Sequence, residues 1–173
     1  MEIRYKDILI RNADKDDASI LASWWNDGSV MEHAGFPYGL GISEKQIIDS
    51  LKNDNDLYRR LIIEYDDKAI GEMNYKVIDN DTVQIGIKIC DDNYQNRGIG
   101  KIILSMLIRE LFNEGYVKIV LDTNPNNLKA RHVYEQLGFK NIGTRIDCWI
   151  DQLGNKQSAV DYELTINDFI EYK

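Results

Sequence analysis

The chain has 173 residues, of which 43% are apolar, with a formal net charge of −8 and a pI near 4.8. This length suits a single domain, residues 1–173, with a sizeable core. The acidic balance disfavours nucleic acid as a partner, because binding to phosphates depends on Lys and Arg. No apolar run approaches the ~18 residues of a membrane span, and the first residues lack the apolar core of a signal peptide, so we expect a cytoplasmic protein with no membrane partner.

The first part of the chain predicts a strand and then a helix. Residues 3–11 have the composition of a strand. Asp14 or Asp16 can cap a helix that runs to about Trp25, and Asp27 with the glycine after it ends that helix.

A loop and a second short helix follow. The loop covers residues 35–41 and contains three glycines. Ser43 and Gln46 form a capping box for a helix that continues through Leu51. Loops of this composition often contact substrates.

Three strands then follow one another closely. They cover about residues 58–65, 69–78 and 82–90, and short polar turns separate them. Such short connections favour an antiparallel meander.

The connections lengthen in the second half of the chain. A helix over 98–114 gives enough length for a crossover to a strand at 117–122, so that strand and the one before the helix should be parallel. A helix over 127–137 and two strands, at about 140–150 and 157–165, complete an α/β series.

The cysteines and histidines do not form a metal-binding pattern. Cys90 and Cys148 lie in strand-like runs, and His33 and His132 are the only histidines. We expect reduced thiols, no disulfide and no metal.

The segment 95–101 has the composition of a phosphate-binding loop. Gly98 and Gly100 let the backbone approach a ligand closely. The unpaired amides and the positive dipole at a helix start favour phosphate oxygens, and neighbouring basic side chains add charge. The spacing fits neither a Walker loop nor a dinucleotide fingerprint, because residues that those motifs require are missing.

Two blocks of sequence together resemble the GNAT superfamily of N-acetyltransferases. The loop pattern Q/R-x-x-G-x-G/A is matched position for position by Gln95 and the two glycines. The second signature, N-x-x-A-x-x-x-Y followed by G-F, is matched by Asn127, Ala130, Tyr134 and the pair Gly138-Phe139.

The resemblance covers residues 68–165 well and the first 67 residues only in outline. It implies an α/β (α+β) GNAT fold: a central, mostly antiparallel mixed sheet of about seven strands with a splayed parallel pair, flanked by about four helices. Many members of the family are dimers, so a homodimer is compatible with the resemblance.

By the resemblance, acetyl-CoA is the cosubstrate and lies in the opening of the splayed strands. Backbone amides at the strand end hold the pantetheine arm and polarise the thioester carbonyl, while amides of the loop hold the pyrophosphate. The residues expected to bind it are Ile89, Cys90, Gln95, Asn96, Arg97, Gly98, Ile99, Gly100, Lys101 and Asn127.

Attack of an amine on a thioester needs a neutral amine, a stabilised tetrahedral intermediate and a proton for the departing thiolate. Tyr134 matches the family tyrosine beside the CoA sulfur and is the expected acid, with core packing as its alternative role. Many members carry Glu in the strand before the loop, where this chain has Gln84. Glu72 and Asp122 are the expected substitutes for the base.

The acceptor is expected to contact Trp25, Glu72 and Trp149, because aromatic walls with carboxylates hold a cationic amine. We therefore predict direct transfer of the acetyl group to the primary amine of a small cationic molecule. A protein N-terminus is the alternative acceptor, since the resemblance extends to aminoglycoside 6'-N-acetyltransferases, spermidine acetyltransferases and ribosomal-protein N-terminal acetyltransferases. A non-catalytic acyl-CoA-binding sensor is a further alternative, because the Glu is missing.

Overall fold

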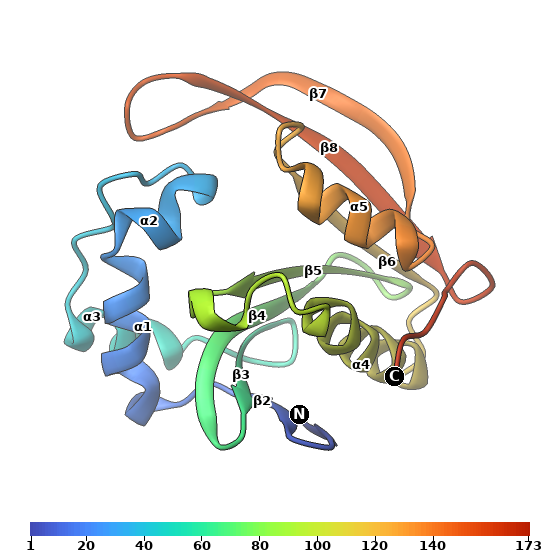
Figure 1. The fold of residues 1–173 in the computed structure, drawn as a ribbon, viewed down its shortest axis with the longest axis horizontal. Coiled ribbons are helices and arrows are strands. Elements are labelled where there is room, and N and C mark those ends of the chain that lie inside the picture. Colours follow the sequence, from blue (N-terminus) through green and yellow to red (C-terminus); the bar gives the residue numbers. More distant parts are fainter.

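One mixed sheet runs through the molecule, with its strands in the spatial order β1-β2-β3-β4-β5-β6-β8-β7 (Figure 1). The computed structural model describes all 173 residues. The strands are β1 (Glu2–Tyr5), β2 (Ile8–Asn12), β3 (Tyr58–Tyr65), β4 (Lys68–Val77), β5 (Thr82–Ile89), β6 (Lys118–Thr123), β7 (Lys140–Ile150) and β8 (Lys156–Thr165).

Five α-helices and three short 3₁₀ turns connect these strands. The helices are α1 (Ala18–Trp25), α2 (Gly28–Met31), α3 (Glu44–Leu51), α4 (Ile99–Asn113) and α5 (Leu128–Gln136), and the turns are η1 (Lys15–Asp17), η2 (Glu32–Ala34) and η3 (Asp92–Tyr94). None of the helices has the length and apolar content needed to cross a bilayer.

The predicted fold class is confirmed, with one strand and one helix more than expected. Residues 3–11 form a hairpin instead of a single strand, because Lys6 adopts a positive φ of 51° and turns the chain between β1 and β2. Asp27 does not merely end α1: its carboxylate accepts a hydrogen bond from the Ser29 amide and starts the four-residue α2. The capping box of Ser43 and Gln46 is present at α3 as predicted.

Side chains on alternate residues of the sheet face two different cores. In β3, Leu61 and Ile63 pack into the larger core, which α4 and α5 cover, while Ile62 between them packs against α1 and α3. Figure 1 shows these helix pairs on opposite sides of the sheet. Because successive side chains of a strand point to opposite faces, one sheet can pack against a helical layer on each side.

The predicted antiparallel meander β3-β4-β5 and the predicted parallel pair β5-β6 are both confirmed. The parallel pairing is short, since it joins only Thr82, Val83 and Gln84 to the start of β6. Beyond Gln84 the two strands have no ladder between them, and this gap in the sheet is where the candidate site lies.

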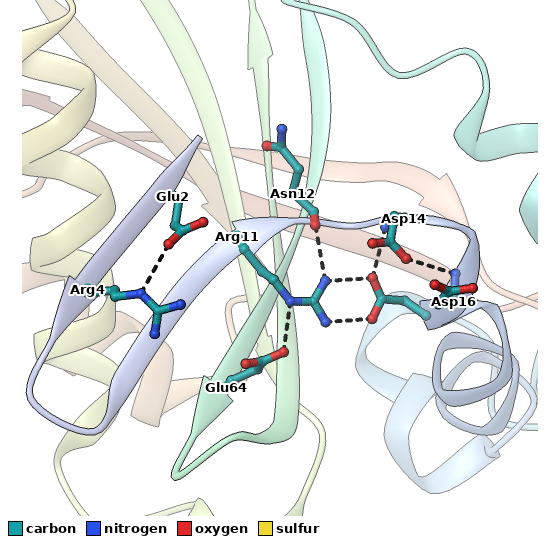
Figure 2. A network of polar contacts seen from close by, with 8 residues as sticks. Glu2, Arg4, Arg11, Asn12, Asp14, Asp16 and Glu64 are labelled. Carbon is teal, nitrogen blue, oxygen red and sulfur yellow. Dashed lines mark hydrogen bonds and ion pairs between the residues drawn. The ribbon is translucent and has the colours of Figure 1, made fainter.

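A polar network fixes the start of α1 against the sheet. The Arg11 guanidinium donates to both Asp17 carboxylate oxygens, at 2.7 and 2.8 Å, and its Nε donates to Glu64 on β3 at 2.8 Å. Figure 2 shows Arg11 reaching Glu64 on one side and the Asn12 carbonyl on the other. Burial acts to raise the pKa of Asp17, but hydrogen bonds from Arg11 and the Asp14 amide outweigh it and hold the pKa below its usual value.

Asp17→Asn should lower the free energy of unfolding at pH 7 by about 1.5–3 kcal/mol, because the half-buried Arg11 guanidinium loses one of its two carboxylate partners. The folded-state pKa of Asp17 is depressed, so its stabilisation is complete above the unfolded pKa and is lost as the pH falls through the folded one. Urea unfolding at pH 7 and below pH ~4 measures both effects. Asp16→Asn, an exposed neighbour, is the control; an equal loss there would contradict the assignment.

Candidate active site

The loop between β5 and α4 presents free backbone amides to solvent. Gly98 has a φ of +77° and precedes α4, whose first turn has no side-chain cap. Asn96 also has a positive φ, of 60°. A Cβ built on Gly98 or on Gly100 meets no atom within 4 Å. The helix start is therefore an open cradle with unpaired N–H groups, which suits phosphate oxygens.

A cavity of about 660 Å³ extends from this loop along the end of β5. We call it the loop cavity. Of the residues predicted to bind acetyl-CoA, only Ile99 lies outside its wall, since Ile99 packs against the larger core. The predicted residues that line it are Ile89, Cys90, Gln95, Asn96, Arg97, Gly98, Gly100, Lys101 and Asn127.

Of the two backbone amides expected at the end of β5, those of Ile89 and Cys90, only one is free. The Cys90 amide donates to the Ile70 carbonyl at 2.9 Å, so it is not free to bind a ligand. Strand alternation turns the neighbouring Ile89 toward the gap, and its carbonyl there accepts from the Gln95 side chain at 3.0 Å. The Ile89 amide is thus the donor that faces the opening.

A second cavity, of about 300 Å³, lies between η2, the ends of β5 and β6, and the β7-β8 hairpin. We call it the hairpin cavity. It contains two of the predicted residues that the loop cavity lacks, Asp122 and Trp149. The two cavities share the residues His33, Ile87, Lys88, Leu104, Asn127 and Tyr134.

Tyr134 lies where the cavities meet. Its ring packs edge-on against Phe139 and Tyr162, with centroids 5.9 and 5.8 Å away, and the residue is only 7% exposed. Its hydroxyl makes no hydrogen bond within the protein. Every fully buried side-chain polar atom does have a partner, so this hydroxyl is not fully buried. The hydroxyl therefore faces the cavities. Burial, with added repulsion from Asp122 and Tyr162, raises the pKa of Tyr134 to about 12.

Asp122 and Asn127 lie beside Tyr134 with partners of their own. The Asp122 carboxylate accepts from Arg145 at 3.0 Å, and the same guanidinium binds Asp161 at 2.8 Å. Asn127 caps α5 through a 3.2 Å hydrogen bond from the Ala130 amide. Both side chains reach a cavity while they are held by neighbouring elements.

Glu72 and Trp25 lie outside both cavities. The Trp25 indole donates to both Glu72 oxygens, at 2.9 and 3.1 Å, and the Lys88 ammonium lies 3.7 Å from Glu72. The structure thus brings Tyr134, Asp122 and Trp149 together and places Glu72 and Trp25 on the neighbouring part of the sheet face.

The two thiols differ in their environment. Cys148 is exposed, whereas Cys90 is buried, and both are free. Burial, with the nearby charge of Glu72, raises the pKa of the Cys90 thiol to about 12. A thiol of this kind is a poor nucleophile at neutral pH.

His33 and Lys88 were not among the residues predicted for the site. Both line the two cavities. Lys88 follows the alternation of β5, which the sequence does show, but His33 belongs to a short turn whose position depends on distant contacts.

The fold and the paired cavities define an acyl-CoA-dependent transferase. The sequence model described as "Acetyltransferase (GNAT) family" matches residues 21–139, and the chain belongs to this family. It is a GNAT N-acetyltransferase that uses acetyl-CoA as its donor.

Curated relatives of the chain are distant. It is 27% identical to the [ribosomal protein bS18]-alanine N-acetyltransferase of Salmonella typhimurium over 108 residues, which are 62% of this chain and 72% of that protein. It is 25% identical to human N-acetyltransferase 8 over 92 residues, half of this chain, and spans 40% of the length of that protein.

Solved structures share the fold almost end to end. The spermidine N-acetyltransferase of Vibrio cholerae, in complex with CoA and spermine, has a TM-score of 0.81 at 18% identity and covers 95% of this chain and 98% of its own. The ribosomal L7/L12 α-N-protein acetyltransferase RimL, in complex with CoA, has a TM-score of 0.84 at 16% identity, with 97% and 99% covered.

Proposed function

We propose that this protein transfers the acetyl group of acetyl-CoA directly to the primary amine of a compact, cationic small molecule. The observation that carries the proposal is the meeting of the two cavities at the free hydroxyl of Tyr134. In this proposal the donor binds in the loop cavity, the amine enters from the hairpin cavity, and the chain acts as a single domain.

The residues divide the chemistry between them. The amides of the α4 start, with Arg97 and Lys101, bind the pyrophosphate. The Ile89 amide stabilises the oxyanion, and the Tyr134 hydroxyl protonates the departing thiolate. The raised pKa of the Cys90 thiol favours direct transfer over an acyl-cysteine.

The hairpin cavity supports a small acceptor. Its volume of about 300 Å³ is at the lower end of the usual range for ligand sites. Trp149 and Asp122 line it and favour a protonated amine by cation–π and charge contacts. Asp122 is a candidate base here. Glu72 lies outside the cavities and acts on the site only through its contacts with Trp25 and Lys88.

A protein N-terminus is the second candidate acceptor. The similarity to the bS18-alanine and L7/L12 acetyltransferases favours it.

Incubation with acetyl-CoA and a panel of acceptors tests both candidates. The panel contains spermidine, kanamycin, lysine and peptides that begin with Ala or Ser, and release of free thiol is followed together with product masses. Acetylation of the small amines is the expected result. Preference for the peptides would favour the second candidate, and tight donor binding without any acetylated product would contradict both.

A further inference from the structure

The identity of the base follows from the groups at the junction of the two cavities. Among the residues that line both cavities, only His33, Lys88 and Tyr134 can exchange a proton. A base acts on the amine where the amine meets the donor, directly or through one water, which favours a group at this junction.

Two of these three groups have other roles. The Tyr134 hydroxyl is the acid of the proposed reaction. The Lys88 ammonium lies 3.7 Å from the Glu72 carboxylate and is its ion-pair partner, and an ammonium group has no acceptor for a proton. Imidazole is the side chain best suited to accept a proton near neutral pH.

A bridge from the far end of the chain holds residues 35–39, which follow the turn that carries His33. Gln152 lies at the tip of the β7-β8 hairpin, and its backbone N–H donates a hydrogen bond to the Gly35 carbonyl at 2.8 Å. Its side-chain oxygen accepts from the Tyr38 backbone amide at 2.8 Å, and its side-chain nitrogen donates to the Gly39 carbonyl at 3.0 Å. Figure 1 shows the hairpin extending toward α2 and the turn after it.

The bridge is also packed tightly. A Cβ at Gly35 would lie 2.3 Å from the Trp149 ring, and Gly35 has a φ of +91°. The segment directly after η2 is therefore held on the hairpin by the backbone amide and side chain of Gln152 and by the Trp149 ring, for which Gly35 leaves room.

We propose that His33 is the general base and that Gln152 is the positioning residue that holds it at the junction. This inference rests on the proposed function. The amine nitrogen forms a bond to the thioester carbonyl carbon, and its proton passes to the free nitrogen of the His33 imidazole. The carbon–sulfur bond then breaks, and the CoA thiolate takes the proton of the Tyr134 hydroxyl. The imidazolium returns one proton through solvent to the Tyr134 phenolate, so both groups are restored.

Several charged and titratable groups share the cavities with His33. Glu32 is the nearest, with its carboxylate 3.9 Å from the imidazole Nε2. The others are Lys88, Cys90, Asp92, Tyr94, Arg97, Lys101, Asp122, Lys129, His132 and Tyr134.

His33→Gln tests the base directly, with the best acceptor of the panel as substrate. We expect kcat/KM at pH 8 to fall at least tenfold, the acid limb of the pH profile to disappear, and the Kd for acetyl-CoA to stay unchanged. Because the His33 side chain is 69% exposed, added imidazole should restore part of the activity of His33→Ala. Tyr38→Phe removes an exposed hydroxyl from the same loop and should leave the kinetics unchanged.

Gln152→Ala tests the bridge. It should lower kcat several-fold while the acid limb remains, because the imidazole is present but less well placed. Leu153→Ala, at the same hairpin tip, is the matched control.

The outcomes separate this inference from the proposed function. If the wild-type protein acetylates no amine, the proposed function fails. If it acetylates amines and His33→Gln keeps both the rate and the acid limb, only the base assignment fails. Loss of the acid limb in Asp122→Asn but not in His33→Gln would assign the base to Asp122 instead.

Discussion

Tyr134→Phe should lower kcat by about 10²–10⁴-fold, the usual contribution of a positioned acid. The tyrosine hydroxyl has no hydrogen-bond partner in the protein, so its removal leaves no buried group unpaired. The phenyl ring keeps its packing on Phe139 and Tyr162. The loss should therefore appear in the chemical step, while the Kd for acetyl-CoA stays within a factor of about two, because the substitution removes no backbone amide donor.

Steady-state kinetics and titration of acetyl-CoA measure the two effects. Tyr75→Phe is the control, because Tyr75 is also a buried phenol but lines neither cavity. Since the pKa of Tyr134 is about 12, the wild-type protein should show no loss of activity from ionisation of this acid below pH 10. An unchanged kcat in Tyr134→Phe would return Tyr134 to a core-packing role.

Gly100→Leu should weaken acetyl-CoA binding about 100-fold, or about 2.7 kcal/mol. Gly100 lines the loop cavity, and the space beside it is open. A leucine side chain would occupy the place of the phosphates and separate them from the amides of the α4 start. Loss of two charge-assisted hydrogen bonds accounts for a change of this size.

Gly100→Ala is the matched control, because Gly100 is helical and an added methyl group meets no atom within 4 Å. It should keep most of the affinity and should not destabilise the helix. Calorimetric titration of acetyl-CoA into each variant compares them, with thermal unfolding as a check on folding. Equal affinities for Gly100→Leu and the wild type would show that the phosphates do not lie in this cradle.

Local patterns predicted most of the fold and most of the residues that line the loop cavity. Alternation and capping residues gave the meander β3-β4-β5 and the helices α3, α4 and α5, because each depends on a few neighbouring residues. The β1-β2 hairpin was missed because a two-residue turn at Lys6 interrupts the apolar pattern without a glycine or proline.

The hairpin cavity was harder to predict, because distant contacts build its wall. The loop that follows the turn of His33 is bound by Gln152, which is more than 110 residues away in sequence. Glu72 was predicted for the site but lies outside both cavities. A sequence pattern can place it on a strand, but only the structure shows that Trp25 occupies both of its oxygens.

The short pairing of β5 with β6 has a consequence for how this protein can diverge. After Gln84 the edge of β5 has no strand beside it, and in the proposed function the donor lies along this edge and is bound by main-chain groups. Main-chain recognition tolerates exchange of side chains as long as the strand keeps its shape. Under the proposed function, the part of the site that binds the donor can therefore stay constant while its side chains change, and selection for a new amine acts on the hairpin and the turn that faces it.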